Sequence, residues 1–211
     1  MDRAAIIAEL SDFPPATLVE AVGGVSDLPP EIRQMVPGAS CVGTAFTVLC
    51  RIGDNAAVTD AVDMAQKGDV LVIDTGNAGV ARHAMWGETA TFASQLRGLA
   101  GIVTNGLIRD IEEMQRMKFP IFAAGVGLRG STKKHPGQFQ VPVVIGDIVI
   151  QPGDYIVAGA DGVLVVPQAK AEAVIAKAKS QRVAEGSRQA RLRAGVKLSD
   201  VFTPPKSNAA E

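Results

Sequence analysis

Two junctions in the chain place charged side chains where an apolar segment ends and a helix-like segment begins. The first is Gly87–Glu88, in the loop after the apolar run VLVID, and the second is Arg109–Asp110 in TNGLIRD, after GLAGIV. Oxygen-ligated Mg²⁺ or Mn²⁺ needs only one or two carboxylates plus water, so Glu88 and Asp110 could form such a site. A helix that begins near Gly87–Ala90 would also offer unpaired backbone amides to a carboxylate or phosphate.

Each of these features also has an ordinary structural interpretation. A carboxylate such as Glu88 is favoured at the start of any helix by the helix dipole, and the series from Asp110 to Glu113 has the form of a capping box. Arg109 could be a solvated arginine, and the glycine-containing loop before Glu88 could be a long surface turn. The spacing alone leaves both interpretations open.

Other catalytic classes have weaker support. The two histidines, His83 and His135, are not spaced as zinc ligands, and no CxxC or G-x-S-x-G motif is present. The glycine-containing loop before Glu88 lacks the G-x-G-x-x-G that a dinucleotide site requires there. Lys67 and Lys118 flank predicted strands and could in principle form a Schiff base. Solvated lysines beside turns are the ordinary case, however, because activation needs a desolvated or cation-flanked site.

Three larger side chains, His83, Met85 and Trp86, stand beside the glycine-containing loop. They could shape a pocket around a ligand. For Met85 and Trp86, burial by packing within the loop is the preferred interpretation, because such side chains are most often simply buried.

The two junctions can act together only if the fold places them side by side. Apolar runs alternate with helix-like segments through the middle of the chain, with strands expected at 70–74, 101–105 and 120–125 and helices at 89–100 and 111–117. This alternation predicts an α/β layered core. Adjacent strands of such a sheet end at the same edge, where ligands bind. We therefore expect Glu88, Arg109 and Asp110 to converge on one cleft.

The flanking segments extend this core. Before it, the sequence predicts helices at 1–12 and 16–24, a strand region at 40–51 and a helix over 55–69 that ends at Gly68. After residue 137, four short apolar runs divided by Gly, Pro and Asp predict antiparallel hairpins. Residues 168–194 predict a helix of ~40 Å, which Gly186 could interrupt, and 201–211 predict a flexible tail.

The composition excludes several classes of protein. Of the 211 residues, 47% are hydrophobic and 20% charged, which is typical of a globular chain, and the net charge of −1 with no basic block argues against a nucleic-acid partner. No apolar run approaches the ~18–20 residues that span a bilayer, so no membrane association is expected. The N-terminus has no signal-peptide pattern, and two cysteines make no disulfide framework, so a cytoplasmic location is expected.

Five segments in a fixed order carry a resemblance to a known family: GDVLVID, WGETAT, GIVTNGLIRDIEEM, FPIFAAG and VPVVIGDIVIQPGDYIVAGADGVLVVP. In these segments the chain resembles the RraA-like family. The resemblance implies an α/β/β/α sandwich, like the swivelling phosphohistidine domain, as a single domain over residues 1–200 that includes the C-terminal helix. It also implies assembly into homotrimers or hexamers, with the active site between subunits.

The family includes aldolases that cleave 4-hydroxy-4-methyl-2-oxoglutarate and 4-carboxy-4-hydroxy-2-oxoadipate and that also decarboxylate oxaloacetate. The aldolases carry an acidic residue, then twenty residues, then Arg–Asp, and this chain has Glu88, twenty residues, then Arg109–Asp110. By this resemblance Asp110 would hold Mg²⁺ or Mn²⁺, Arg109 would bind the 2-oxo acid and stabilise a pyruvate enolate, and Glu88 would contact the metal through water. The amides of Gly87, Glu88, Thr89 and Ala90 would bind the substrate carboxylate.

The resemblance also leaves alternatives open. Glu88 stands where the best-known aldolases have Asp, and Gly159 where many members have an acidic residue, so a different substrate such as a sugar-acid derivative is possible. Glu185 is the match for a glutamate that the C-terminal helix supplies to the neighbouring subunit. The family also contains non-catalytic, ring-shaped regulators of a ribonuclease. Those regulators lack the intact Arg–Asp pair, so Arg109–Asp110 favours an enzyme.

Overall fold

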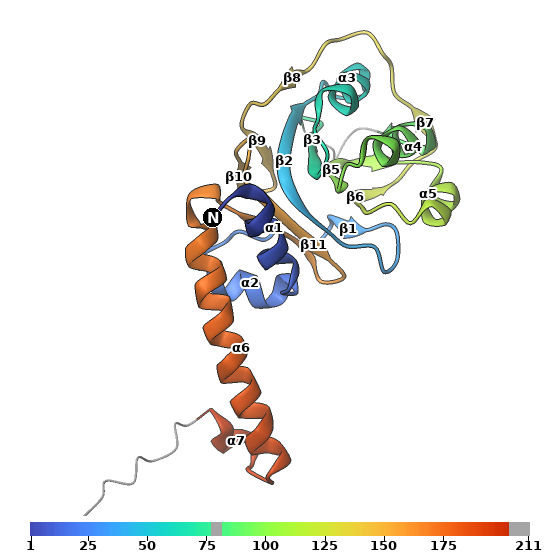
Figure 1. Cartoon of the computed structure of the whole chain (residues 1–211). Helices are drawn as coiled ribbons and strands as arrows, with labels where there is room; N and C mark the ends of the chain where they lie inside the picture. Colours follow the sequence, from blue (N-terminus) through green and yellow to red (C-terminus); the bar gives the residue numbers. More distant parts are fainter. Residues whose placement is uncertain (77–81, 203–211) are drawn as a thin grey trace, which may run out of the picture.

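A mixed, strongly curved sheet forms the centre of the protein, and helices cover it on two sides in the computed structural model (Figure 1). The structure describes residues 1–76 and 82–202. The helices are α1 (Arg3–Ser11), α2 (Pro15–Val22), α3 (Ala56–Met64), α4 (Glu88–Arg97), α5 (Ile111–Met117), α6 (Ala171–Arg193) and α7 (Leu198–Val201). The strands are β1 (Arg33–Gln34), β2 (Cys41–Leu49), β3 (Asp69–Asp74), β4 (His83–Trp86), β5 (Gly101–Ile108), β6 (Ile121–Val126), β7 (Arg129–Gly130), β8 (Gln138–Phe139), β9 (Val143–Ile145), β10 (Ile148–Ile150), β11 (Tyr155–Gly159) and β12 (Gly162–Val166).

The main sheet runs in the order β1-β6-β5-β3-β2-β11-β12. Strands β2, β3, β5 and β6 are parallel, as expected for strands joined through helices, whereas β11–β12 and β9–β10 are antiparallel hairpins. The sheet curls until its two ends almost meet. Between them, the Leu28 amide, shortly before β1, donates to the Val163 carbonyl in β12 at 2.9 Å. The expectation of hairpins after residue 137 is confirmed.

Each strand of the parallel part is buried on both faces, which explains its continuous apolar sequence. In β3, Leu71 and Ile73 pack in a cluster with α3, while Val70 and Val72 pack in an inner cluster with β9 and β10. A third cluster joins β11 and β12 to α1, α2 and α6. Helices, sheet, sheet and helices therefore follow one another, and the predicted α/β/β/α architecture is confirmed.

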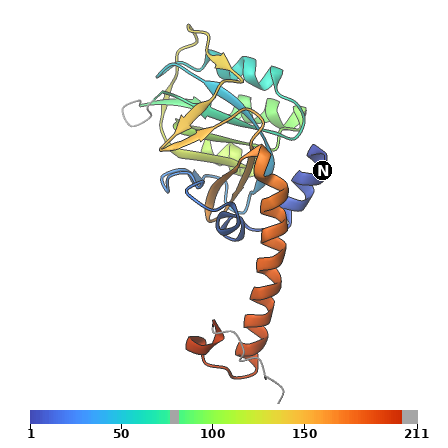
Figure 2. The ribbon, with the colours of Figure 1, turned by 90° about the vertical axis from the view of Figure 1, so that its left-hand side faces the viewer.

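Helix α6 projects away from the layered body (Figure 2). Its buried residues, Ala171, Val174, Ile175 and Ala178, all lie in its first half, and its second half extends beyond the sheet (Figure 1). Gly186 does not interrupt it, so the 23-residue helix is ~35 Å long. Within residues 1–76 and 82–202, no helix is long and apolar enough to cross a membrane.

Several boundaries differ from expectation. Helix α4 ends at Arg97, because Gly98 adopts a left-handed backbone, and β5 continues to Ile108. Helix α3 ends at Met64, not at Gly68, because residues 65–68 form the turn into β3. In the segment before Glu88, expected to be a loop, His83–Trp86 form β4, and 77–81 lie outside the described residues. Val201, expected to begin the tail, is the last residue of α7 and is buried, whereas 203–211 lie outside the described residues.

Candidate active site

Strands β4 and β5 end side by side and carry the two predicted junctions to one edge of the sheet. Gly87–Glu88 follows β4 and Arg109–Asp110 follows β5, and the Arg109 amide donates to the Trp86 carbonyl at 3.0 Å. Glu88, Arg109 and Asp110 line one cleft of about 210 Å³ together with Gly87, Thr89 and Ala90. The predicted convergence is therefore confirmed, although the strand before Glu88 is β4, which the sequence did not reveal.

Asp110 does not cap the helix that follows it. Its backbone is left-handed (φ 60°, ψ 40°), and its side chain makes no capping hydrogen bond to α5. Oδ2 instead accepts a hydrogen bond of 3.1 Å from the Glu88 amide at the start of α4. The capping-box interpretation is thus wrong: the carboxylate is turned toward the neighbouring junction. An aspartate tolerates this backbone better than most residues.

Two glycines provide the space that the Arg109–Asp110 pair occupies. A Cβ atom on Gly87 would lie 2.5 Å from Asp110 Oδ2, and a Cβ atom on Gly130 would lie 2.9 Å from Arg109 Nη1. Gly87 has an extended backbone (φ −165°), so the reason for glycine there is the close approach of Asp110 and not a special backbone conformation. Both walls of the cleft thus fit closely around the pair.

The Arg109 guanidinium remains available to an anion. Its only ion pair in the described part of the chain is with Asp110, from Nε to Oδ2 at 3.5 Å, and 48% of the side chain is exposed. The amides of Thr89 and Ala90 lie in the first turn of α4, where helix amides lack carbonyl partners. The Glu88 amide, in contrast, is already bound by Asp110. The cleft therefore combines a planar cation with unpaired amides, a combination suited to a carboxylate.

The residues of the cleft fit a hard divalent cation that retains most of its water. Asp110 Oδ1 has no hydrogen-bond partner among the described residues, and 37% of the side chain is exposed. No group of three or more His, Cys, Asp or Glu residues suited to a metal occurs in residues 1–76 and 82–202. One or two carboxylate oxygens with several waters is the coordination that Mg²⁺ accepts in proteins, whereas zinc sites use His and Cys.

Among the cleft residues that the sequence did not single out, three have polar side chains: Asn55, Ser131 and Lys133. Asn55 Nδ2 donates to the Met85 carbonyl at 3.1 Å, and its buried Oδ1 has no partner in the described structure. Ser131 Oγ donates to the Ala84 carbonyl at 2.9 Å. All three come from segments far from both junctions, so no local pattern could have identified them.

Met85 and Trp86 fulfil both interpretations, because they line the cleft and are also buried in the core. Met85 and Trp86 are buried, as predicted, and Trp86 Nε1 donates to Thr91 Oγ1 at 2.7 Å. Both residues belong to strand β4. His83, which also belongs to β4 and pairs with Arg129 in β7, is not among the residues that line the cleft.

Neither lysine considered for a Schiff base lines the cleft. The stem of Lys67 lies against Gly98, and Lys118 occupies the left-handed position that ends α5. Gly159 ends β11 near Pro15, also outside the cleft. Glu185 lies on the projecting half of α6, beside Glu20 and Arg188. Its contribution to a neighbouring subunit's site stays a prediction.

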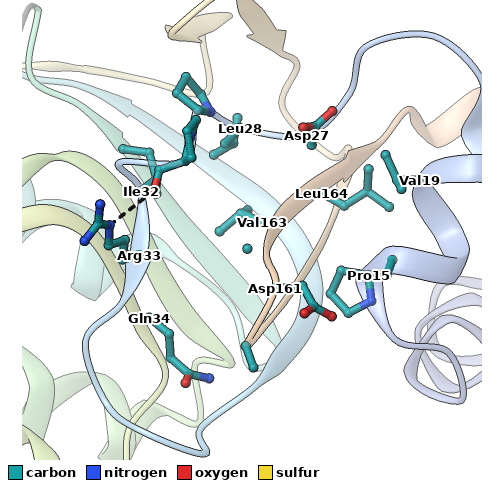
Figure 3. A pocket seen from close by; sticks show the side chains of 15 residues that line it. Pro15, Val19, Asp27, Leu28, Ile32, Arg33, Gln34, Asp161, Val163 and Leu164 are labelled. Atoms are coloured by element: carbon teal, nitrogen blue, oxygen red, sulfur yellow. Dashed lines mark hydrogen bonds between the residues drawn. The ribbon is translucent and has the colours of Figure 1, made fainter.

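A second cavity, of about 650 Å³, lies between α2, the segment before β1 and the β11–β12 turn (Figure 3). Its walls are mainly Pro, Val, Leu and Ile side chains, and Arg33 and Asp161 stand on opposite sides. The Arg33 Nε atom donates to the Pro30 carbonyl at 3.3 Å. None of the predicted site residues lines this cavity. The smaller cleft is therefore the better candidate for catalysis, because the predicted residues Glu88, Arg109 and Asp110 meet there at the start of α4.

Comparison with known sequences and structures identifies relatives of the chain. A family model described as "RraA-like: Aldolase/RraA" matches residues 7–165. A Halalkalibacterium halodurans protein named "Putative 4-hydroxy-4-methyl-2-oxoglutarate aldolase" is 36% identical over 183 residues, which cover 87% of this chain and 86% of that protein. The solved structure of an uncharacterized protein from Pseudomonas syringae has a TM-score of 0.84 at 30% identity, covering 94% of this chain and 92% of that one.

A second solved structure represents another function within this fold. The structure titled as the RNA-processing inhibitor RraA from Thermus thermophilis has a TM-score of 0.62 at 28% identity, covering 67% of this chain and 84% of that one. Both solved structures share the fold, and the family model over residues 7–165 shows that the chain belongs to the RraA-like family.

Proposed function

We propose that the protein is a divalent-metal-dependent carbon–carbon lyase, a class II aldolase. It would cleave 4-hydroxy-2-oxo acids, such as 4-hydroxy-4-methyl-2-oxoglutarate and 4-carboxy-4-hydroxy-2-oxoadipate, to pyruvate and a second 2-oxo acid, and it would decarboxylate oxaloacetate. The observation that carries the proposal is the Arg109–Asp110 pair, held against the start of α4 with its guanidinium still available in a cleft. The aldolase name of the Halalkalibacterium relative supports it.

The reactions share one demand on the cleft, which is to stabilise the negative charge of a pyruvate enolate. A divalent cation held by Asp110, with Glu88 reached through water, would supply Lewis-acid stabilisation of that charge. Arg109 donates two parallel hydrogen bonds to the oxygens of the 2-oxo acid and adds a permanent positive charge. The amides of Thr89 and Ala90 anchor the substrate carboxylate and fix its orientation.

Aldol cleavage also needs a group that removes the proton of the 4-hydroxyl. Neither His83 nor His135 lines the cleft, so a water molecule that Glu88 orients would accept this proton. Decarboxylation of oxaloacetate has no such proton to remove. The two reactions therefore differ in their need for Glu88.

We also propose that the active form is a homotrimer or hexamer. The second half of α6 projects from the body, and Val183 there is 76% exposed, which favours contact with another copy. Such an arrangement would allow Glu185 to reach the site of a neighbouring subunit. Light scattering on the purified protein gives the mass of the assembly directly.

A non-catalytic regulator that binds a ribonuclease or another protein is the second candidate. The similarity to the RNA-processing inhibitor from Thermus favours it. The two candidates differ in one requirement: a regulator needs neither metal nor an arginine that accepts a 2-oxo acid.

Pyruvate release from oxaloacetate, with and without Mg²⁺, tests the proposal. Mg²⁺ alone decarboxylates oxaloacetate slowly, so a reaction without protein gives the background rate. We expect metal-dependent release above this background, its loss in Asp110→Ala, and its retention in Asp161→Ala, which removes a carboxylate from the second cavity. Release no faster than background, with either oxaloacetate or 4-hydroxy-4-methyl-2-oxoglutarate, would favour the regulator.

A further inference from the structure

One wall of the cleft comes from the segment after β7, which belongs to neither predicted junction. Ser131 and Lys133 of this segment line the cleft, together with Gly130 at the end of β7. The segment contains little regular structure beyond a single bridge between Asp54 and Thr132. Its position therefore depends on a few specific contacts, and four of its hydrogen bonds go to Asp54.

The Asp54 carboxylate divides its two oxygens between two tasks. Oδ1 accepts from the Ala56 amide at 3.0 Å and so fixes the start of α3. Oδ2 accepts from Thr132 Oγ1 at 2.6 Å, from the Lys134 amide at 2.8 Å, from the His135 amide at 3.3 Å and, at 3.2 Å, from the His135 ring when Nδ1 carries the proton. One oxygen atom thus holds Thr132, Lys134 and His135 in place.

Asp54 is well suited to this task because it is buried and ionised. Only 2% of its side chain is exposed. Burial would raise the pKa of Asp54, but the hydrogen bonds that it accepts, led by the one from Thr132, outweigh this and hold the pKa well below the usual aspartate range. Two backbone hydrogen bonds reinforce the attachment, from the Asn55 amide to the Thr132 carbonyl and from the Thr132 amide to the Gly53 carbonyl, both at 2.9 Å.

Lys133 stands between the two residues that Asp54 fastens most tightly. Its backbone is therefore fixed at the rim of the cleft, and it forms no ion pair within the described part of the chain. The Arg109 guanidinium lies against Gly130, on the same wall. The cleft thus presents two cations, and the substrates proposed above carry at least two carboxylates.

We propose that Asp54 is a positioning residue of the cleft: by holding Thr132 and Lys134 it places Lys133 to bind the substrate carboxylate that Arg109 and the α4 amides do not bind. This inference rests on the proposed function, and it extends that function to the recognition of dicarboxylic over monocarboxylic 2-oxo acids. Lys133 selects the substrate, and Asp54 acts only through Lys133.

The test is a double-mutant cycle on pyruvate release from oxaloacetate at saturating Mg²⁺. Asp54→Asn keeps the shape of the side chain but replaces one carboxylate oxygen with an amide nitrogen, which donates hydrogen bonds and does not accept them. Lys133→Met removes the ammonium and keeps most of the stem. We expect each change to raise KM about tenfold, with kcat changed less than threefold, because a charge-assisted contact to bound substrate is lost. The double variant should be no worse than either single variant.

Asp69→Asn is the matched control. Asp69 is also a buried carboxylate that accepts hydrogen bonds from a threonine hydroxyl and a backbone amide, Thr44 Oγ1 at 2.7 Å and the Gln66 amide at 2.8 Å, but it lies outside the cleft. It should lower thermal stability and leave KM unchanged. Thr132→Val removes the shortest of the hydrogen bonds to Asp54 Oδ2 and should raise KM by a smaller factor, which keeps the test valid if Asp54→Asn folds poorly.

Any of three results would overturn the inference. KM could stay unchanged in both Asp54→Asn and Thr132→Val, or it could rise equally in Asp69→Asn. The rise of KM in the double variant could also equal the product of the rises in Asp54→Asn and Lys133→Met. Amide hydrogen exchange separates this failure from failure of the proposed function. If the wild-type protein releases no pyruvate, the proposed function fails. Faster exchange at Lys134 and His135 in Asp54→Asn, absent in Asp69→Asn, would still support the attachment, and unchanged exchange would refute it.

Discussion

Replacing Gly87 by alanine tests whether the close fit around Asp110 matters for catalysis. The added Cβ atom would lie 2.5 Å from Asp110 Oδ2, about 0.8 Å closer than an ordinary carbon–oxygen contact of ~3.3 Å. The carboxylate must move away by a similar distance. Its 3.1 Å hydrogen bond from the Glu88 amide is then lost, and so is the placement of any cation that it holds.

A displacement of about 1 Å in an active site can cost about 100-fold in rate, which corresponds to ~2.7 kcal/mol of activation free energy. We therefore expect kcat/KM for oxaloacetate to fall about 100-fold in Gly87→Ala, with a higher Mg²⁺ concentration needed for half-maximal rate. Folding should change little, because the extended backbone at Gly87 accepts alanine without strain. The melting temperature should stay within about 4 °C of wild type.

Gly159→Ala is the matched control for this experiment. Its Cβ atom would meet only Pro15, at 3.4 Å, and it lies outside the cleft. Wild-type kcat/KM and an unchanged Mg²⁺ requirement in Gly87→Ala would refute the argument that Asp110 must be held against α4. An equal loss in Gly159→Ala would show that the effect is not specific to the cleft.

Three further outcomes follow from the structure. Glu88→Gln should lower aldol cleavage of 4-hydroxy-4-methyl-2-oxoglutarate at least 100-fold but oxaloacetate decarboxylation less than tenfold, as measured by coupled reduction of the pyruvate formed; equal losses would contradict a role in proton removal. Burial raises the pKa of Cys41 and Cys50 to about 12, so both thiols should resist iodoacetamide at pH 8.5 in the folded protein and react in urea. Because the unfolded thiols ionise near pH 9, the free energy of unfolding should decrease from about pH 9 to 12, and a constant value in urea titrations over that range would disagree. Gly186→Ala should raise the melting temperature by about 2–4 °C, since Gly186 lies inside α6 with open space around it, and an unchanged value in calorimetry would mean that α6 frays in solution.

The sequence alone determined the elements whose periodicity is local. The continuous apolar runs of β3 and β5 indicated strands buried on both faces, and the divided runs after residue 137 indicated hairpins. It also placed Arg109–Asp110 at the end of a strand, next to a helix. The rule that parallel strands end at one edge then brought this pair to Glu88. Such predictions succeed because a few neighbouring residues decide them.

Strand β4, just before Glu88, could not be predicted from neighbouring residues. Strand β4 is only four residues long, so its sequence carries no clear alternation. What makes it a strand is its pairing with β5 on one side and β7 on the other. Those partners are distant in sequence, and only the folded sheet supplies them.

The tertiary structure alone decided the role of Asp110 and the composition of the cleft. The series Asp110 to Glu113 fits a capping box, yet the carboxylate turns to the Glu88 amide, because β4 brings that amide within 3.1 Å and the left-handed backbone aims the side chain toward it. Asp54 likewise meets Thr132 across 78 positions. A side chain chooses among hydrogen-bond partners by distance in space, and sequence separation does not encode that distance.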